Sequence, residues 1–296
     1  MIRKLALAAL LLGAATPALA QNAPPPSPWA PLQDRPTCTR DELKAASAAY
    51  VEAQRTGNLG LLPLHEKVRL LENMTDVERG AGLWNTALPV ANALSLHDSR
   101  RCKTFTEVIV TDGGTPYIIG TRLYLHDGKV IRVDSIVTKT GDWLFNANAF
   151  LKYTQAENWA PLHPYQRTPE AEMIRGANAY LDGFSDKFTA IPWGTPCARL
   201  EGGAYTNRQN SPTASCEVGM PPGVLYIVNR DYLVDEEMGT INVFCRFGSS
   251  TGGPDSHTFR YIDGKFRQIH TLTAIPGPQA SDDGGMVRGA PDPNAS

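Results

Sequence analysis

Arg132 and Asp134 are the first residues of the sequence whose types and spacing could do chemistry. They lie in an alternating apolar–polar run, and alternate residues of a β-strand share one face of its sheet. If that face lines an apolar cavity, Asp134 is a candidate general base, because desolvation makes a carboxylate a better proton acceptor. Arg132 would then orient Asp134 or hold an oxyanion. If the face is solvated, the two side chains form an ordinary surface pair.

An internal repeat adds His270 to the candidates. Short segments around Tyr50 and Tyr180 align, and so do two later Asp-Gly pairs with their flanking residues. When the two Asp-Gly pairs are aligned, His270 falls on Asp134. Histidine can act as an acid or a base near neutral pH, so Asp134 and His270 are predicted to occupy equivalent functional positions in the two copies. The alternative is a structural histidine on a strand.

The same repeat pairs further polar and aromatic residues. Glu72 falls on Glu201, and both follow apolar strand residues, so both could point into a cavity. The hydroxyl of Tyr50 or Tyr180 could donate to a substrate oxygen while the ring packs against an aromatic ligand; the alternative is core packing. Trp84, Trp143 and Trp193 could form aromatic walls for a substrate, although tryptophans are more often core residues, and Asn73 beside Glu72 is a further candidate for substrate binding.

Other chemistries find no support in the sequence. Residues 248–252 fit G-x-S-x-G, but Gly253 and Pro254 follow where a nucleophile elbow needs a helix, so this segment is predicted to be a loop. The six histidines show no H-E-x-x-H spacing, and the cysteines show no C-x-x-C. The sequence has neither a glycine-rich dinucleotide motif nor a P-loop. We therefore predict no metal and no cofactor.

Helices and hairpins must position the candidate residues. Thr39 and Glu42 form a capping box that predicts a helix up to Gly57, and Thr168-Pro169 opens a second helix. An Asp-Gly pair between two alternating runs predicts a hairpin near the end of each copy. Each copy is therefore predicted to be α+β, with a helix, an irregular middle and a closing antiparallel hairpin. A sheet that curls around its helices makes a cone, which suits a small and largely apolar ligand.

Composition and charge restrict the class of protein. The 28 basic and 30 acidic side chains give a net charge of −2, which argues against a nucleic-acid-binding surface. Residues 1–20 are typical of a signal peptide, with two basic residues, an apolar run and a small-residue cleavage pattern ending at Ala20. No later segment is an apolar membrane span. We predict a periplasmic or secreted protein with a proline-rich leader at residues 21–37 and a disordered tail at residues 277–296.

Five cysteines in an oxidising compartment predict disulfides. Cys197 and Cys216 flank a turn-rich stretch and could staple it. Cys38 and Cys102 could tie the start of the first helix to a later strand. Cys245 is then left over inside an apolar run, either as a nucleophile or as a buried inert thiol.

Several segments, taken in order, resemble the SnoaL-like branch of the nuclear transport factor 2-like superfamily, and more narrowly exported proteins with two such domains. These segments are Glu72-Asn73 and Gly82-Leu83-Trp84 in the first copy, and Ala177-Asn178-Ala179-Tyr180, Ile191-Pro192-Trp193 and the Cys197 and Cys216 pair in the second. The resemblance implies two tandem cone-shaped α+β barrels, over residues 38–160 and 161–276. Each would be a curved antiparallel sheet wrapped around N-terminal helices. Superfamily members are often dimers, so a homodimer is an expectation.

The resemblance also directs the functional hypothesis. The superfamily includes cofactor-independent isomerases, cyclases, dehydratases and lyases, together with domains that only bind or assemble. We expect an exported, cofactor-independent lyase or isomerase that acts by acid/base chemistry on a small apolar, aromatic compound. Asp134 would remove a proton, while Tyr50, Glu72 or Arg132 stabilises the developing oxyanion or protonates the leaving oxygen. The alternative is a non-catalytic module that binds a small molecule or assembles with a partner.

Overall fold

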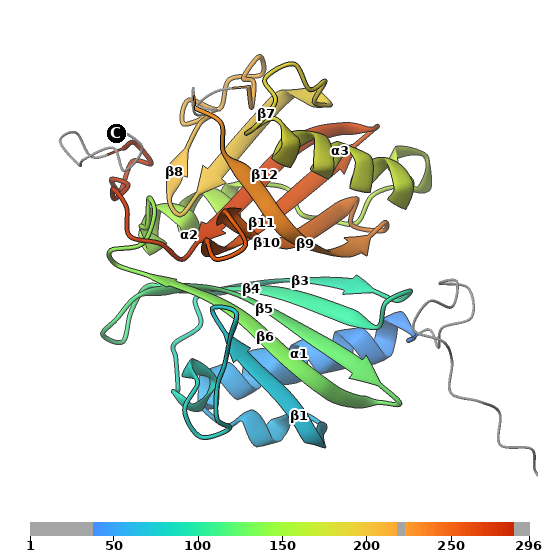
Figure 1. Cartoon of the computed structure of the whole chain (residues 1–296), viewed down its shortest axis with the longest axis vertical. Helices are drawn as coiled ribbons and strands as arrows, with labels where there is room; N and C mark the ends of the chain where they lie inside the picture. The colour runs from blue at the N-terminus through green and yellow to red at the C-terminus, as the bar shows by residue number, and fades with distance from the viewer. Residues whose placement is uncertain (1–37, 218–222, 287–296) are drawn as a thin grey trace, which may run out of the picture. The chain divides into compact units, whose positions relative to one another are not determined.

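The computed structural model of this 296-residue chain describes residues 38–217 and 223–286. The expected signal peptide and proline-rich leader lie outside the described residues. Within the described chain one arrangement occurs twice, a helix followed by six strands (Figure 1). Two α+β domains in tandem, as the sequence predicts, therefore make up the described structure.

The bounds of the elements are as follows. The first domain contains α1 (Arg40–Thr56), the 3₁₀ turn η2 (Leu59–Leu61), β1 (Leu64–Glu72), β2 (Thr75–Asp76), the 3₁₀ turn η3 (Leu83–Asn85), β3 (Asn92–Asp98), β4 (Lys103–Val110), β5 (Tyr117–His126) and β6 (Lys129–Lys139). The connection contains α2 (Ala147–Ala156) and the 3₁₀ turn η4 (Pro164–Gln166). The second domain contains α3 (Glu170–Asp182), β7 (Trp193–Glu201), β8 (Ala204–Tyr205), β9 (Tyr226–Asp235), β10 (Thr240–Gly248), β11 (Gly253–Ile262) and β12 (Lys265–Thr273).

The two sheets share one strand order. It is β2-β1-β6-β5-β4-β3 in the first domain and β8-β7-β12-β11-β10-β9 in the second. Leu71 lies opposite Asp134, and Leu200 lies opposite His270, which confirms the predicted repeat at the level of single residues. One detail differs from the expected antiparallel sheet, because β1 pairs with β6, and β7 with β12, in parallel. The strands between each pair provide the long crossover that a parallel pairing requires.

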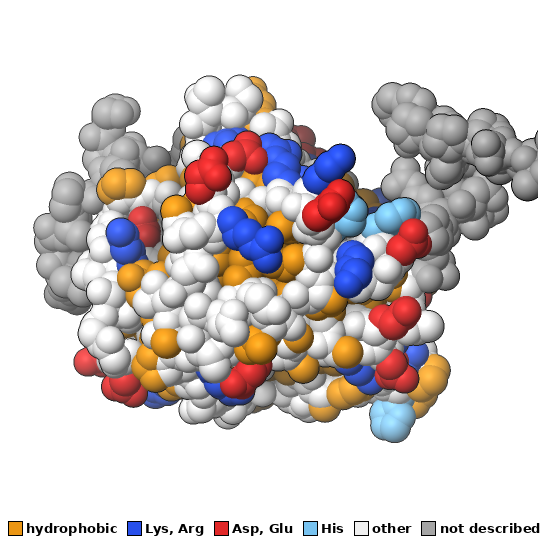
Figure 2. Space-filling view, turned by 90° about the horizontal axis from the view of Figure 1, so that it is seen from below, with side chains coloured by type: hydrophobic (Ala, Val, Ile, Leu, Met, Phe, Trp, Pro, Cys, Tyr) orange, Lys and Arg blue, Asp and Glu red, His pale blue; other side chains and the backbone are white. Residues whose placement is uncertain are grey.

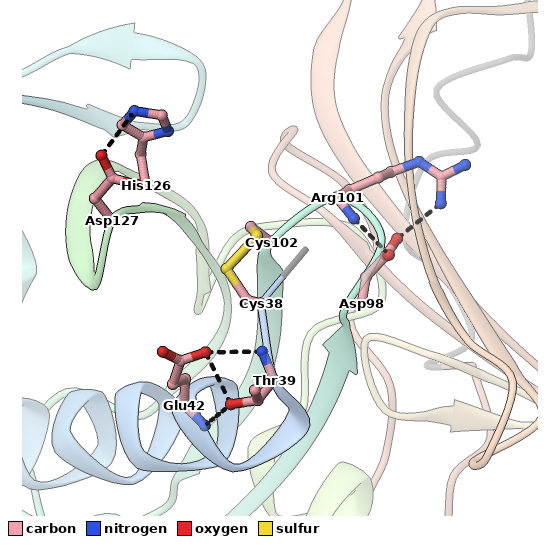
Figure 3. Close-up of a disulfide and its surroundings, with 8 residues drawn as sticks. All are labelled: Cys38, Thr39, Glu42, Asp98, Arg101, Cys102, His126 and Asp127. Atoms are coloured by element: carbon pink, nitrogen blue, oxygen red, sulfur yellow. Dashed lines mark hydrogen bonds and ion pairs between the residues drawn. A yellow bond between two sulfur atoms is a disulfide. The ribbon is translucent and has the colours of Figure 1, made fainter. Parts of the chain in front are cut away.

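Helix α1 begins and ends where the sequence predicts. Thr39 and Glu42 exchange the two hydrogen bonds of a capping box, and Gly57 ends the helix with a φ of +66°, which glycine adopts without strain. The Cys38–Cys102 disulfide joins the residue before this cap to the turn between β3 and β4 (Figure 3). The predicted Cys197–Cys216 disulfide is present as well. Closing loops of this size stabilises a domain by about 3–4 kcal/mol each in the chain-entropy account.

Each sheet packs its inner face against its own helix. In the first domain Tyr50 of α1 belongs to a core with Val133 and Val137 of β6. In the second domain Tyr180 of α3 belongs to a core with Phe259 of β11. Because side chains alternate along a strand, the residues directly before and after each of these inward-facing residues lie on the outer face of the sheet.

The outer faces of the two sheets form a third core, shared by both domains. Phe105 of β4 meets Phe244 of β10 edge to face, with ring centroids 6.0 Å apart. Leu272 of β12 belongs to the same cluster. In Figure 1 the sheets accordingly lie between α1 and α3, with α2 beside them. The two domains are therefore held together by an apolar interior and not only by the chain that connects them.

Arg122 is buried in this shared core. Its Nε and Nη2 donate to Oδ1 of Asn242 over 3.0 and 2.7 Å, and Nη2 also donates to the Asn242 carbonyl oxygen. Its Nη1 pairs with Asp231 at 3.1 Å, and its guanidinium lies 4.2 Å from the centroid of the Phe244 ring. A buried arginine is tolerated only with such a full set of partners.

The segment after β12 corrects the expected tail. Trp143 and Leu144 donate main-chain hydrogen bonds to Ile275 and Pro278, and Ala280 is buried. Main-chain groups as far as Gly284, whose carbonyl oxygen accepts from the Tyr205 nitrogen, are thus paired with the rest of the protein, although the composition of this segment contains little to bury. Residues 287–296 of the expected tail lie outside the described residues.

The surface carries charges of both signs. On the face shown in Figure 2, acidic and basic side chains are interspersed, and basic side chains do not gather into one patch. Within the described residues no helix is long and apolar enough to cross a membrane.

Replacing Phe244 by alanine tests the shared core. We expect Phe244→Ala to lower the free energy of unfolding by about 3–5 kcal/mol, because it leaves a cavity against Phe105 and removes the ring beneath Arg122. The matched control is Phe188→Ala, whose ring is 97% exposed and whose loss should change stability by less than about 0.5 kcal/mol. Urea unfolding monitored by fluorescence and by circular dichroism should give one transition. Two separated transitions would contradict a shared core.

Candidate functional site in the second domain

The inner face of the second sheet is polar at positions where the first sheet is apolar. Strand register makes the comparison direct, because the two sheets pair their strands in the same way. Cys245, Asp255 and Thr273 take the places of Val108, Ile119 and Val137. Two residues further along β11, on the same face, His257 takes the place of Thr121. The second cone thus carries a polar group of side chains that the first cone lacks.

Cys245, Asp255 and His257 form a compact buried cluster. Oδ2 of Asp255 lies 3.0 Å from Nδ1 of His257 and 3.5 Å from Sγ of Cys245. The Cys245 Sγ atom is 4.0 Å from the same Nδ1 atom. Thr273 donates its hydroxyl to the other carboxylate oxygen, Oδ1 of Asp255, over 2.8 Å. All four side chains are buried, so their mutual contacts must replace the water they have lost.

Tyr180 brings a hydroxyl group to this cluster from helix α3. Its side chain is fully buried, and its hydroxyl has no hydrogen-bond partner among the described residues. Burial raises the pKa of Tyr180, while Arg199 opposes this effect and the charges of Asp255 and Cys245 add to it. The hydroxyl of Tyr50, its counterpart in α1, instead bonds to Oγ1 of Thr121 at 2.6 Å. Leaving a buried hydroxyl unpaired costs free energy unless a ligand or water supplies the missing partner.

Aromatic rings surround the Tyr180 side chain. The centroid of its ring lies between 5.0 and 6.2 Å from those of Phe184, Trp193, His257, Phe259 and Phe266. The Arg199 guanidinium lies 5.9 Å from the same ring and is paired with Glu201. The inner face therefore combines aromatic side chains with a few polar groups, which are the residue types typical of sites for small organic molecules.

The cluster is not arranged as a nucleophilic triad. In such a triad the nucleophile and the carboxylate contact opposite nitrogens of the imidazole ring. Here both Cys245 and Asp255 face Nδ1 of His257. Burial, followed by the neighbouring Asp255 charge, also raises the pKa of the Cys245 thiol well above its usual value, which disfavours the nucleophilic thiolate. Of the two interpretations of Cys245, the buried thiol is the one that the structure supports.

Asp134 and Arg132 do not line a cone. Val133 and Val137 point into the first cone, so Asp134 lies on the outer face of β6, where it is 3% exposed. The carboxylate is bound by the half-buried guanidinium of Arg132, which also lies 4.8 Å from the centroid of the Tyr124 ring. Our placement of this pair in an apolar cavity is therefore wrong, because the valines and not the charged residues face the helix.

His270 occupies the corresponding outer position in the second domain. Its Nδ1 lies 3.0 Å from Glu107 of the first domain, and its Nε2 lies 2.7 Å from Glu157 just beyond α2. Burial disfavours the imidazolium, but Glu107 and Glu157 outweigh it and raise the pKa of His270 to about 10. Rings of Phe150 and Trp159 cover the imidazole edge to face. His270 thus lies in the contact between the two domains and away from the cone interior.

The remaining candidates of the first domain make internal contacts. Glu72 accepts a hydrogen bond from the main-chain nitrogen of Leu83 at 2.7 Å, and Asn73 bonds through its side chain to both main-chain groups of Val137. Trp84 is buried in the first core. Of the aligned candidates of the second domain, Tyr180 contacts His257 of the polar cluster, while Trp193 contacts the Tyr180 ring and Glu201 pairs with Arg199.

Sequence reasoning missed Asp255, His257 and Arg199. The loop predicted at residues 248–252 covers residues 249–252 in the structure, because Gly248 still belongs to β10, and β11 begins directly after it at Gly253. Asp255 and His257 are alternate residues of that strand and share its inner face. An alignment of the two copies through this strand pairs Asp255 with Ile119 and His257 with Thr121. The replacement of an apolar residue by an aspartate is the sequence signal that could have found the cluster.

Comparisons with known proteins add little about function. A family model described as "Domain of unknown function (DUF8021)" matches residues 166–273. A search of curated protein sequences finds no match. Among solved structures, an NTF-2 like protein of unknown function from Burkholderia xenovorans LB400 is similar, with 14% sequence identity and a TM-score of 0.26. The match covers 33% of this chain and 84% of that protein.

The charge state of His270 can be measured directly. Because the pKa of about 10 in the folded protein lies above the ordinary 6.5, we expect nitrogen-edited NMR to show both ring nitrogens protonated at pH 8. The linked stability is fully present below pH 6.5 and is lost as the pH rises toward 10, with a slope of up to about 1.4 kcal/mol per pH unit. A His270 midpoint below 7 would refute the assignment.

Proposed function

We propose that the second domain binds a small aromatic molecule inside its cone and acts on it by acid/base chemistry. The observation that carries this proposal is the Tyr180 hydroxyl, which is buried and unpaired within the described residues. Burying an unsatisfied hydroxyl costs about 1–3 kcal/mol. A ligand oxygen that accepts from Tyr180 would recover the lost hydrogen bond.

The surroundings of Tyr180 favour an aromatic ligand with an oxygen substituent. Trp193, Phe184 and Phe259 offer ring faces and edges for packing. Arg199 is close enough to Tyr180 to lower the energy of negative charge on a ligand oxygen. Isomerisation or elimination needs such charge stabilisation together with one proton acceptor and one proton donor.

His257 is the proton acceptor in this proposal. Its Nδ1 is held by Asp255, which leaves Nε2 as the atom that can take a proton from the ligand. Tyr180 would donate its proton to the ligand oxygen as the carbon–hydrogen bond breaks. Asp255 is itself oriented by Thr273, so the imidazole is held in one orientation before the ligand arrives.

The first domain serves as a scaffold in this proposal. Apolar side chains fill its cone at the positions of the polar cluster, and Tyr50, Thr121 and Ser135 satisfy one another in a hydrogen-bonded chain. Its outer face supplies Arg122 and Glu107 to the contact with the second domain. The function of one copy is thus to complete the core that supports the other.

We also propose that the protein acts outside the cytoplasm. The Cys38–Cys102 and Cys197–Cys216 disulfides are typical of oxidising compartments. The signal-peptide pattern of residues 1–20 agrees with this location. Mass spectrometry of the mature chain should find an N-terminus near Gln21.

Replacing each of the two aligned tyrosines by phenylalanine separates function from folding. We expect Tyr180→Phe to leave the free energy of unfolding unchanged or to raise it by about 1 kcal/mol, because it removes an unpaired buried hydroxyl. Tyr50→Phe should lower it by about 1 kcal/mol, because it removes the bond to Thr121. Urea unfolding of both variants provides the comparison. A larger loss for Tyr180→Phe than for Tyr50→Phe would show that its hydroxyl has a structural partner.

A panel of hydroxylated mono- and bicyclic aromatic compounds tests the chemistry. The compounds are incubated with the full chain in heavy water, and NMR records deuterium incorporation or product formation. For a compound that reacts, Tyr180→Phe should reduce the rate about 100-fold or more, while Tyr50→Phe should keep it within about twofold. Binding without exchange or product would favour the non-catalytic module. An unchanged rate in Tyr180→Phe would contradict the proposed proton donor.

A further inference from the structure

Three side chains of the second cone have the types and spacing of a metal site. Cys245, Asp255 and His257 each offer one ligand atom, and these atoms all lie within 4.8 Å of one another. Their separations are 3.0, 3.5 and 4.0 Å. A tetrahedral zinc ion with ligand bonds of about 2.0–2.3 Å holds its ligand atoms about 3.3–3.6 Å apart. Shifts of about half an ångström would therefore bring all three atoms onto one ion.

We propose that Cys245, Asp255 and His257 bind one zinc ion in the second domain, with its fourth position open toward Tyr180. The convergence of sulfur and carboxylate oxygen on the same ring nitrogen is unexplained by a nucleophilic triad but is expected of a metal ligand set. The inference extends the proposed function, since both rest on the second cone being the functional site.

The choice of metal follows from the ligands. One sulfur, one imidazole nitrogen and one carboxylate oxygen suit zinc, whereas calcium and magnesium prefer oxygen ligands alone. A thiolate on Cys245 and the carboxylate of Asp255 balance the two positive charges of the ion, with His257 neutral. The buried assembly is then neutral overall, which avoids the cost of an isolated buried charge.

Two further groups support the site. Thr273 donates to the carboxylate oxygen of Asp255 that does not face the cluster, and such outer hydrogen bonds orient metal ligands. The Tyr180 hydroxyl is unpaired among the described residues, and its ring centroid is 5.5 Å from that of His257. A water molecule or a ligand oxygen on the ion would give this hydroxyl its partner. With the ion bound to Nδ1, neutral His257 carries its proton on Nε2, so a hydroxide on the ion would take the ligand's proton in place of His257, and Tyr180 would remain the proton donor.

The chain offers a clean spectroscopic test. Four of its five cysteines form disulfides, so Cys245 is its single thiol. The full chain without a histidine tag is stripped with a chelator and titrated with zinc or with cobalt. We expect one zinc per chain by elemental analysis, and a near-ultraviolet thiolate-to-cobalt absorption band. That band can arise from Cys245 alone. Cobalt bound without it, or no stoichiometric metal, would overturn the proposal, whether or not any variant folds.

Variants locate the other ligands. Cys245→Ser should abolish the band, and His257→Gln should weaken metal affinity at least tenfold. His126→Gln is the matched control, because His126 is exposed and contacts Asp127 (Figure 3); it should bind metal as the parent does. Circular dichroism confirms folding. Undiminished binding in His257→Gln would overturn the ligand set. Tyr180→Phe should keep the metal while losing the reaction, so a failed zinc site and a failed acid/base site give different results.

Discussion

The structure depends on the burial of the outer face of each sheet against the other. In an isolated domain of this kind, that face would meet water and could carry charges without cost. Here Phe105, Phe244 and Leu272 form an apolar centre, and buried charged groups near it need partners, which the opposite domain supplies for Arg122 and His270. Arg122 meets Asn242 across the contact, and His270 meets Glu107. Removing one partner would leave a buried charge unpaired, so these polar pairs fix how the two sheets fit together.

This contact also explains why the two copies can differ inside. A cone that must fold alone needs an interior that is well packed and free of unsatisfied groups. The first copy comes closer to this demand, since Tyr50, Thr121 and Ser135 pair with one another among valines and leucines, although Nε1 of Trp84 has no hydrogen-bond partner among the described residues. The second copy does not, since it buries Cys245, Asp255 and His257 together. Stability supplied at the shared core offsets the cost of a polar site in one half.

The fold could be predicted from sequence far better than the site. Local signals such as the capping box at Thr39 and the Asp-Gly hairpins depend on neighbours in the chain, and they hold in the structure. The repeat placed His270 on Asp134 correctly. What alternation cannot reveal is which face of a strand points inward, because both faces of these sheets are buried. The charged face of β6 was therefore assigned to the cone, while the structure places the valines there.

The second cone joins two features that would be liabilities in a purely structural domain. A free thiol beside disulfides in an oxidising compartment can take part in exchange, and an unpaired buried hydroxyl weakens the fold. Cys245 is protected by complete burial, and Tyr180 is enclosed by aromatic rings. The first copy has a valine at the equivalent of Cys245 and a paired tyrosine at the equivalent of Tyr180, so the fold itself requires neither feature. Both features lie beside the Asp255–His257 pair, and this coincidence on one inner face is the strongest reason to assign function to the second domain.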